Sequence, residues 1–364
     1  MAPTGSIADT NASEAPDEAL PIEAGPAASL IYRWDLDKTY LRTEFDTVRN
    51  LVKTAFERPG DKRTVPGAAA LLRELRASGP RGIHILSGSP EQMRRALEEK
   101  LRLDGVRWDE LTLKPNLRNL LRGRFRALRD QVGYKLGALL ASRAGMSVGL
   151  DEILFGDDAE TDALVYSLYA DVCAGRVGTA ELTDVIARTA LTEPQRADIL
   201  RIAGRLPQRD FCKRIFIHLQ RVSPLNAFAV YGPRVCPFYN YLQPALVLVD
   251  LNVLDARAAL RVAADLVIDQ AFDADGLVAS HRDLAMRGQV GPSTAERVIG
   301  ALDAIDHIGL ATARPVVEAY VHALARTAPR WESVVQPHHP RIDYVPLLAS
   351  ERDRVRRVRL RAQG

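Results

Sequence analysis

The sequence predicts an α/β fold in which a parallel, Rossmann-like sheet of about five strands precedes a mostly α-helical C-terminal region. From Ser29 to about residue 222, short apolar runs alternate with stretches of helical spacing, the pattern of a parallel sheet with crossover helices. Three of the runs are followed directly by clusters of polar residues, as expected where a parallel sheet carries a ligand site. After about Phe238 the strand pattern fades and helical spacing predominates.

The expected strands follow from the apolar runs. In chain order they lie at residues 30–34, 82–86, 106–113, 152–155 and 214–219. Helices are expected at residues 68–77 and 91–103, where apolar residues recur with helical spacing among good helix formers. In the C-terminal region, helices are expected to begin near Asp255 and at Ser293, since Ser293-Thr-Ala-Glu has the form of a capping box.

The chain divides by composition into four parts. Its 364 residues are enough for two domains, each able to bury its own core. Residues 1–27 carry five acids, no lysine or arginine and few large apolar side chains, so a disordered acidic tail is expected. An α/β domain is expected at residues 28–222, a mostly helical region at 223–350 and a basic tail at 351–364.

Composition also excludes several classes of protein. With 47% apolar and 26% charged residues, the chain has ordinary globular composition. Cys173, Cys212 and Cys236 show no C-x-x-C spacing, which predicts buried thiols in a reducing compartment instead of disulfides or a zinc ribbon. The longest uncharged stretch has 15 residues, fewer than the roughly 20 that span a bilayer. The first residues lack the features of a secretory signal, so a cytoplasmic location is expected.

Polar residues with the chemistry of a phosphate site occur at the ends of the expected elements. In chain order they are Asp35, Asp37 and Thr39; Ser87 and Gly88; Lys135; and Asp157, Asp158 and Asp162. The first two groups and the last follow strands, while Lys135 lies at the start of an expected helix. Because the carboxyl ends of parallel strands share one edge of a sheet, these groups are expected to converge there.

These residue types match the needs of phosphoryl transfer. A carboxylate can attack phosphorus and form an aspartyl phosphate, and Asp35 is the expected nucleophile. Asp37 is the expected acid and base, which protonates the leaving oxygen and then accepts a proton from water. Ser87 and Lys135 complete the expected catalytic set, because a hydroxyl and an ammonium stabilise charge on the phosphoryl oxygens. The expected contacts to the substrate phosphate are Thr39, Ser87, Gly88 and Lys135.

Carboxylates so close together would repel one another and an anionic substrate unless a hard cation lay among them. Magnesium, which prefers oxygen ligands, fits this position, so Mg2+ is the expected cofactor. Asp35, Asp157 and Asp162 are expected to hold it directly or through water, with Asp158 as the alternative to Asp162. Asp37 is included as a ligand through its main-chain carbonyl.

At these residues the chain resembles the haloacid-dehalogenase superfamily, whose four motifs match in identity and order. Within it, residues 31–172 resemble the catalytic domain of the phosphatidate phosphatase family first associated with actin patches. The resemblance rests on Asp35-Leu-Asp-Lys-Thr-Tyr-Leu-Arg-Thr, Val65-Pro-Gly-Ala-Ala, Leu86-Ser-Gly-Ser-Pro, Asp109-Glu-Leu-Thr-Leu-Lys-Pro, Tyr134-Lys135 and Gly156-Asp-Asp-Ala-Glu-Thr-Asp162-Ala-Leu-Val-Tyr166. The superfamily match implies a magnesium-dependent phosphohydrolase with an aspartate nucleophile. The closer match implies a lipid phosphate substrate and little or no cap domain.

Two features depart from the pattern of that family. Lys38 stands where an acidic residue is usual, and residues 173–213 form an insertion where the family has a short connection. The helical region after residue 240 has no recognised counterpart. Trp331 and the pair His338 and His339 are interpreted as structural because they lack partners at metal-ligand spacing. Trp34, directly before Asp35, is expected to pack in the core.

The basic charge keeps other substrates and functions open. Residues 114–135 carry seven basic side chains against one acid, and residues 351–364 carry six arginines against two acids. Either segment could contact an anionic membrane surface or nucleic acid; the plainer interpretations are a solvated helix face for the first and a disordered terminus for the second. The alternatives are therefore a phosphatase of nucleotides or nucleic-acid ends, and a non-catalytic phosphate-binding or scaffolding module. The expected partner is a phosphorylated substrate, for which a lipid phosphate at a membrane surface is one candidate.

Overall fold

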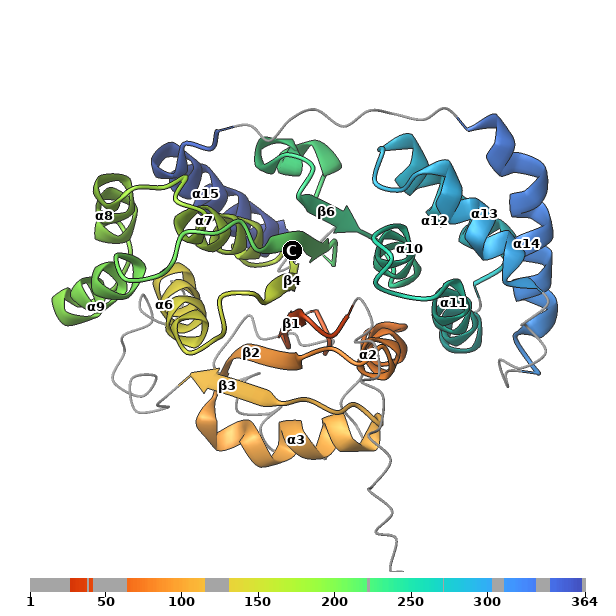
Figure 1. Cartoon of the computed structure of the whole chain (residues 1–364), viewed down its shortest axis with the longest axis horizontal. Helices are drawn as coiled ribbons and strands as arrows, with labels where there is room; N and C mark the ends of the chain where they lie inside the picture. Colours follow the sequence, from red (N-terminus) through yellow and green to blue (C-terminus); the bar gives the residue numbers. More distant parts are fainter. Residues whose placement is uncertain are drawn as a thin grey trace, which may run out of the picture.

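The computed structural model describes residues 27–37, 39–41, 64–114, 131–220, 223–270, 272–302, 311–331 and 341–361 (Figure 1). Several segments singled out in the sequence fall outside these ranges. They are the acidic tail up to residue 26, Lys38, residues 42–63, in which little or no cap is expected, residues 115–130 of the basic stretch, and the pair His338 and His339.

A six-stranded, all-parallel sheet forms the centre of the described structure. Its strands are β1 (Leu30–Asp35), β2 (Gly82–Pro90), β3 (Glu110–Lys114), β4 (Asp151–Asp157), β5 (Cys212–His218) and β6 (Val235–Phe238). Their order is β3-β2-β1-β4-β5-β6, so the chain builds the sheet outward from β1 to one side and then to the other. The order reverses between β1 and β4, the position at which open parallel sheets bind ligands.

The predicted α/β class with a parallel sheet is confirmed, but the sheet has one strand more than the five expected. The additional strand, β6, has four residues and lies at the edge of the sheet beside β5. It contains Pro237, which lacks an N–H group and is tolerated in an edge strand. The sheet therefore continues past residue 222, where the sequence pattern ends the α/β domain.

The boundaries of two predicted strands differ from those observed. The strand expected at 106–113 begins only at Glu110, because Val106 closes the turn after the preceding helix by donating its N–H to Leu101. β2 continues past residue 86 to Pro90 with an irregular register, so Ser87 lies within the end of the strand and not after it.

Helices cover both faces of the sheet (Figure 1). One face packs against α2 (Ala68–Ala77), α3 (Arg94–Leu103), α10 (Leu242–Asp250) and α11 (Ala256–Gln270), with α12 (Ala274–Met286), α13 (Pro292–Gly300) and α14 (Arg314–Thr327) farther out. The other face packs against α6 (Gln131–Ala144) and α7 (Asp162–Cys173), which are covered by α8 (Thr179–Ala187), α9 (Glu193–Ala203) and α15 (Tyr344–Arg361). The predicted helix at 68–77 is confirmed as α2, and the one at 91–103 begins with a 3-10 turn before α3. The insertion at 173–213 thus supplies α8 and α9.

Aromatic side chains from three adjacent strands pack the first face of the sheet. Trp34 of β1 stacks on Phe155 of β4 with 4.0 Å between ring centroids, and Phe155 stacks on Phe216 of β5 at 4.8 Å. All three rings are buried, so Trp34 is a core residue as predicted. Because side chains alternate along a strand, the next residue, Asp35, is directed to the opposite face, where α6 lies.

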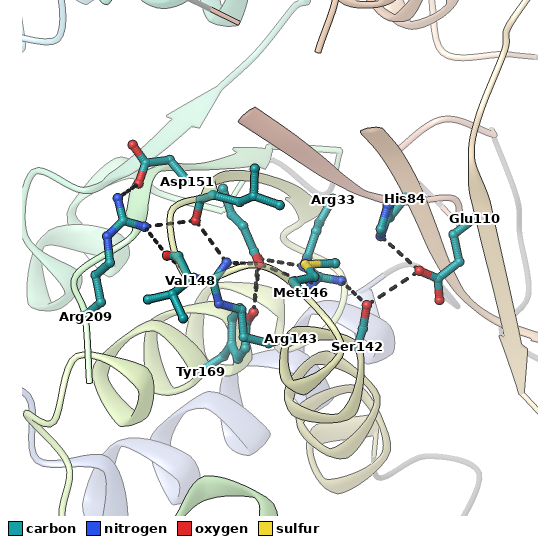
Figure 2. Close-up of polar contacts among 12 residues, drawn as sticks. Arg33, His84, Glu110, Ser142, Arg143, Met146, Val148, Asp151, Tyr169 and Arg209 are labelled. Atoms are coloured by element: carbon teal, nitrogen blue, oxygen red, sulfur yellow. Dashed lines mark hydrogen bonds and ion pairs between the residues drawn. The ribbon is translucent and has the colours of Figure 1, made fainter. Parts of the chain in front are cut away.

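A buried polar network ties α6 to the sheet (Figure 2). Arg33 of β1 donates two hydrogen bonds to Glu152 of β4, at 2.6 and 3.2 Å, and one to Ser142 of α6 at 3.1 Å. Arg143 of α6 and Tyr169 of α7 donate to the same carboxylate. Buried charges are tolerated when they are paired in this way. The network therefore fixes the C-terminal end of α6 against β1 and β4.

The prediction of a capping box that starts at Ser293 is wrong, although a helix does begin close to this residue. α13 begins at Pro292 with Gly291 as its N-cap, because proline suits the first helical position. The Gly291 N–H and the Thr294 hydroxyl instead donate to Asp250, at 2.8 and 2.6 Å. The helix expected near Asp255 is confirmed, since α11 starts at the next residue.

The basic tail is a helix, and the interpretation as a disordered terminus is wrong for residues up to 361. α15 buries Tyr344, Leu348 and Val355 and packs against α7 and α8. Tyr344 also donates a hydrogen bond to Asp171 of α7, with 2.5 Å between the oxygens. Apolar burial and this buried polar contact together hold the helix on the domain.

Two expectations drawn from composition can be compared with the structure. Cys173, Cys212 and Cys236 are buried and form no disulfides, as predicted. Within the ranges that the structure describes, no helix is both long and apolar enough to cross a bilayer.

Candidate functional site

Three buried carboxylates meet at the carboxyl edge of the sheet, where the strand order reverses. Asp35 ends β1, Asp157 ends β4, and Asp162 is the first residue of α7. One oxygen from each lies within 4.8 Å of the others. The approach of Asp162 requires a glycine at position 156, since a Cβ atom there would lie 2.5 Å from an oxygen of Asp162.

Lys135 of α6 brings a buried ammonium to these carboxylates. Its Nζ donates to Asp35 at 2.8 Å, to Asp162 at 2.5 Å and to Glu160 at 3.1 Å. Burial alone lowers the pKa of Lys135, but the three carboxylates outweigh burial and hold the pKa well above its usual value. The lysine is therefore charged at neutral pH.

Burial is the largest influence on the pKa values of Asp35 and Asp162. It raises the pKa of Asp35 well above its usual value; Lys135 opposes the shift, and neighbouring acids including Asp162 reinforce it. The pKa of Asp162 is raised by burial and by Glu160, against the opposing charge of Lys135. The acids around Lys135 outnumber its single positive charge. The negative charge that is not compensated is unfavourable in a buried site.

Asp37 lies next to this group and is held by two serines. Ser87 Oγ donates to Asp37 at 2.7 Å, and Ser89 Oγ donates to the same carboxylate at 3.1 and 3.2 Å. Burial raises the pKa of Asp37, while the hydrogen bond from Ser87 opposes that shift. Thr39 reaches back to Asp35, with 3.5 Å between its hydroxyl and the carboxylate. Gly88 lies in β2 between the two serines.

The structure distinguishes between the two candidates for the last acid. Asp158 is turned away from the carboxylate group: its Oδ2 accepts the Ser223 N–H at 2.9 Å, and its own N–H donates to the His218 carbonyl at 3.0 Å. Asp162 belongs to the group, and Asp158 does not. The side chain of Asp37 also lies outside the three.

Asp35, Asp157 and Asp162 fit a divalent cation. Their carboxylate oxygens are hard ligands, they lie close enough together to share one ion, and the excess negative charge around Lys135 would be balanced by two positive charges. The structure thus brings Asp35, Asp157 and Asp162 together, as the sequence pattern predicts, and leaves Asp158 outside the group.

Sequence reasoning missed three residues that touch the site. Glu160, whose carboxylate contacts Lys135, was visible as an acid between Asp157 and Asp162. The others come from distant elements: Tyr241 donates to the Thr39 carbonyl at 2.5 Å, and Arg354 of α15 binds the loop that follows β4. No local spacing in the sequence indicates either contact.

The fold and site define an α/β protein with a Rossmann-like parallel sheet and a buried acidic cluster beside a lysine at its carboxyl edge. Comparison of the chain with protein-family models, curated proteins and solved structures finds no match in any of the three.

Proposed function

We propose that the protein is a magnesium-dependent phosphohydrolase that cleaves a phosphomonoester through an aspartyl phosphate on Asp35. The observation that carries the proposal is the position of Asp35 between the ammonium of Lys135 and the carboxylates of Asp157 and Asp162, at the edge of the sheet where ligands bind. A carboxylate, a lysine and a set of oxygen ligands are the groups that phosphoryl transfer uses.

Each residue has a distinct role in this proposal. A carboxylate oxygen of Asp35 forms a bond to phosphorus as the bond to the leaving oxygen breaks, and water later cleaves the aspartyl phosphate. Asp37 protonates the leaving oxygen and then takes a proton from that water. Without substrate the single O–H of Ser87 donates to Asp37 at 2.7 Å. In this proposal that O–H turns to a phosphoryl oxygen when substrate binds and acts there with the ammonium of Lys135, while Ser89 continues to orient Asp37. Thr39 and Gly88 complete the contacts to the phosphate.

Asp35, Asp157 and Asp162 would hold Mg2+ in this proposal. When bound, the ion supplies positive charge that offsets the negative charge on the phosphoryl oxygens. The arrangement agrees with the resemblance to the haloacid-dehalogenase superfamily, which we propose as the family of this chain. A phosphatidate-like lipid is the substrate we propose from the closer resemblance, with nucleotide or nucleic-acid phosphates as the alternative. The buried thiols support a reducing, cytoplasmic location.

A non-catalytic phosphate-binding module is the competing class. The position of Asp37 argues against it, since a module that only binds phosphate gains nothing from a second buried carboxylate held beside Asp35 by two serines. Phosphate binding without turnover would favour the module.

The test is a phosphatase screen of the full chain with Mg2+ over aryl, lipid, sugar, nucleotide and oligonucleotide phosphates. The nearly isosteric Asp35→Asn variant should lose roughly 10⁴-fold or more of the activity, because it removes the nucleophile. Asp198→Asn, at an exposed position, is the matched control and should retain full activity. Full metal-dependent activity in Asp35→Asn would refute the proposed mechanism.

A further inference from the structure

Arg354 of α15 binds the loop between β4 and α7 from its outer side. Its Nη1 donates to the Asp158 carbonyl at 2.6 Å, and its Nη2 donates to the Glu160 carbonyl at 3.0 Å. Nη1 also donates to Ser223 Oγ at 3.1 Å. The two guanidinium nitrogens therefore hold two carbonyls of a loop that joins Asp157 to Asp162.

The same loop is held from its inner side by the site itself. Asp157 Oδ1 accepts the N–H groups of Ala159 and Glu160, at 2.6 and 3.0 Å. Asp162 Oδ2 accepts the Asp157 N–H at 3.2 Å. The loop thus directs N–H groups toward the carboxylates and carbonyls toward the arginine, so its position depends on both sets of contacts.

Contacts with Glu351 and Phe228 also hold the Arg354 side chain in place. Glu351, one turn earlier on α15, accepts hydrogen bonds from its Nε at 3.0 Å and its Nη2 at 2.8 Å. The guanidinium lies 5.7 Å from the ring centroid of Phe228, and only 12% of its side chain is exposed. Arg356 and Arg357, on the same helix, are exposed. Arg354 is therefore distinguished from these tail arginines by burial and by its acceptors.

We propose that Arg354 is a positioning residue that sets the separation of Asp157 and Asp162 and so controls how tightly the site binds a divalent cation. The inference rests on the proposed function. Residues that orient the ligands of a metal typically change its affinity by about 10–100-fold when they are substituted. The C-terminal helix, which the sequence presents as a basic tail, is in this view a support of the active centre.

The planar fork of arginine makes a specific test available. Lysine keeps the charge but presents a single nitrogen, so it cannot hold the two carbonyls in the geometry of a guanidinium. Arg354→Lys should therefore weaken Mg2+ binding about 10–100-fold. Glu351→Gln keeps Arg354 but removes the negative charge of the carboxylate that orients it. This variant should also weaken Mg2+ binding, but less than Arg354→Lys does. Arg356→Lys is the matched control and should bind Mg2+ as the wild type does.

Mg2+ binding to the full-length proteins is measured by calorimetry, and the Mg2+ concentration for half-maximal activity is measured separately. Urea unfolding of each variant shows whether it is folded. Weaker Mg2+ binding in folded Arg354→Lys, with a normal Arg356→Lys control, supports the proposal. Unchanged Mg2+ affinity in Arg354→Lys and Glu351→Gln, with a normally binding wild type, overturns the role of Arg354 alone. A wild type that neither binds Mg2+ nor releases phosphate overturns the proposed function as well.

Discussion

Replacing Lys135 by methionine should destabilise the metal-free protein severely. The ammonium is fully buried and pairs with Asp35, Glu160 and Asp162 at 2.8, 3.1 and 2.5 Å. Methionine fills similar volume but leaves three buried carboxylates without their cation. Breaking a buried charge pair in this way costs about 3–5 kcal/mol of the free energy of unfolding. Since whole domains are stable by about 5–15 kcal/mol, the loss is a large fraction.

The assay is urea unfolding of the full chain at neutral pH, first without divalent cations and then with Mg2+. Lys213→Met is the control, because Lys213 pairs with Asp151 at 3.0 Å with half of its side chain exposed; this variant should lose at most about 1 kcal/mol. Mg2+ should restore stability to the Lys135→Met variant, because a cation bound only by the folded state stabilises it. A free energy of unfolding for Lys135→Met within about 1 kcal/mol of the control would refute the electrostatic argument.

Two further predictions concern pH and packing. Burial lowers the pKa of His281 to about 3, so between pH 6.5 and 3 the unfolded chain binds a proton that the folded chain does not. The protein should lose about 1.4 kcal/mol of stability per pH unit over that window from this group, and none above it. The free energy of unfolding in urea should fall between pH 7 and pH 5 in the wild type, and it should fall by about 2 kcal/mol less in His281→Gln. Gly156→Ala would place a Cβ 2.5–2.8 Å from atoms of Asp162 and Tyr166; it should cost about 1–3 kcal/mol and weaken Mg2+ binding, measured by calorimetry.

Each of these has a result that would contradict it. An identical pH dependence in His281→Gln and the wild type would mean that the buried imidazole, which contacts Tyr320 at 2.9 Å, does not stay neutral. Gly300→Ala is the control for Gly156→Ala, because a Cβ at Gly300 meets no other atom within 4 Å. Equal stability and Mg2+ affinity in the two alanine variants would show that Asp162 can move without consequence.

The sequence was sufficient to predict the parts of the protein that depend on local pattern. The strand containing Trp34 and the helix at 68–77 follow from apolar runs and helical spacing, which reflect burial on one element. Asp35 and Asp157 could be brought together without any contact information, because the carboxyl ends of parallel strands share one edge.

The features that were missed depend on contacts between distant segments. β6 is short and contains Pro237, so it has neither the length nor the pattern of a strand, and only pairing with β5 makes it one. α15 buries Glu351 along with its apolar residues, so it shows no clean apolar stripe. Asp158 and Asp162 are acids at the beginning and end of the connection between β4 and α7, and only the hydrogen bond from Ser223 shows that Asp158 is the one that turns away.

The long-range hydrogen bonds that hold the site in place also determine when the site can be completed during synthesis. The bond from Tyr241 to Thr39 spans 202 residues, and the bond from Arg354 to Asp158 spans 196. Contacts between such distant positions form late, because the chain must first close a long loop. All six strands and the three carboxylates leave the ribosome before Arg354 does. The sheet can therefore form on the nascent chain, while the loop after β4 gains its outer support only after α15 has been made.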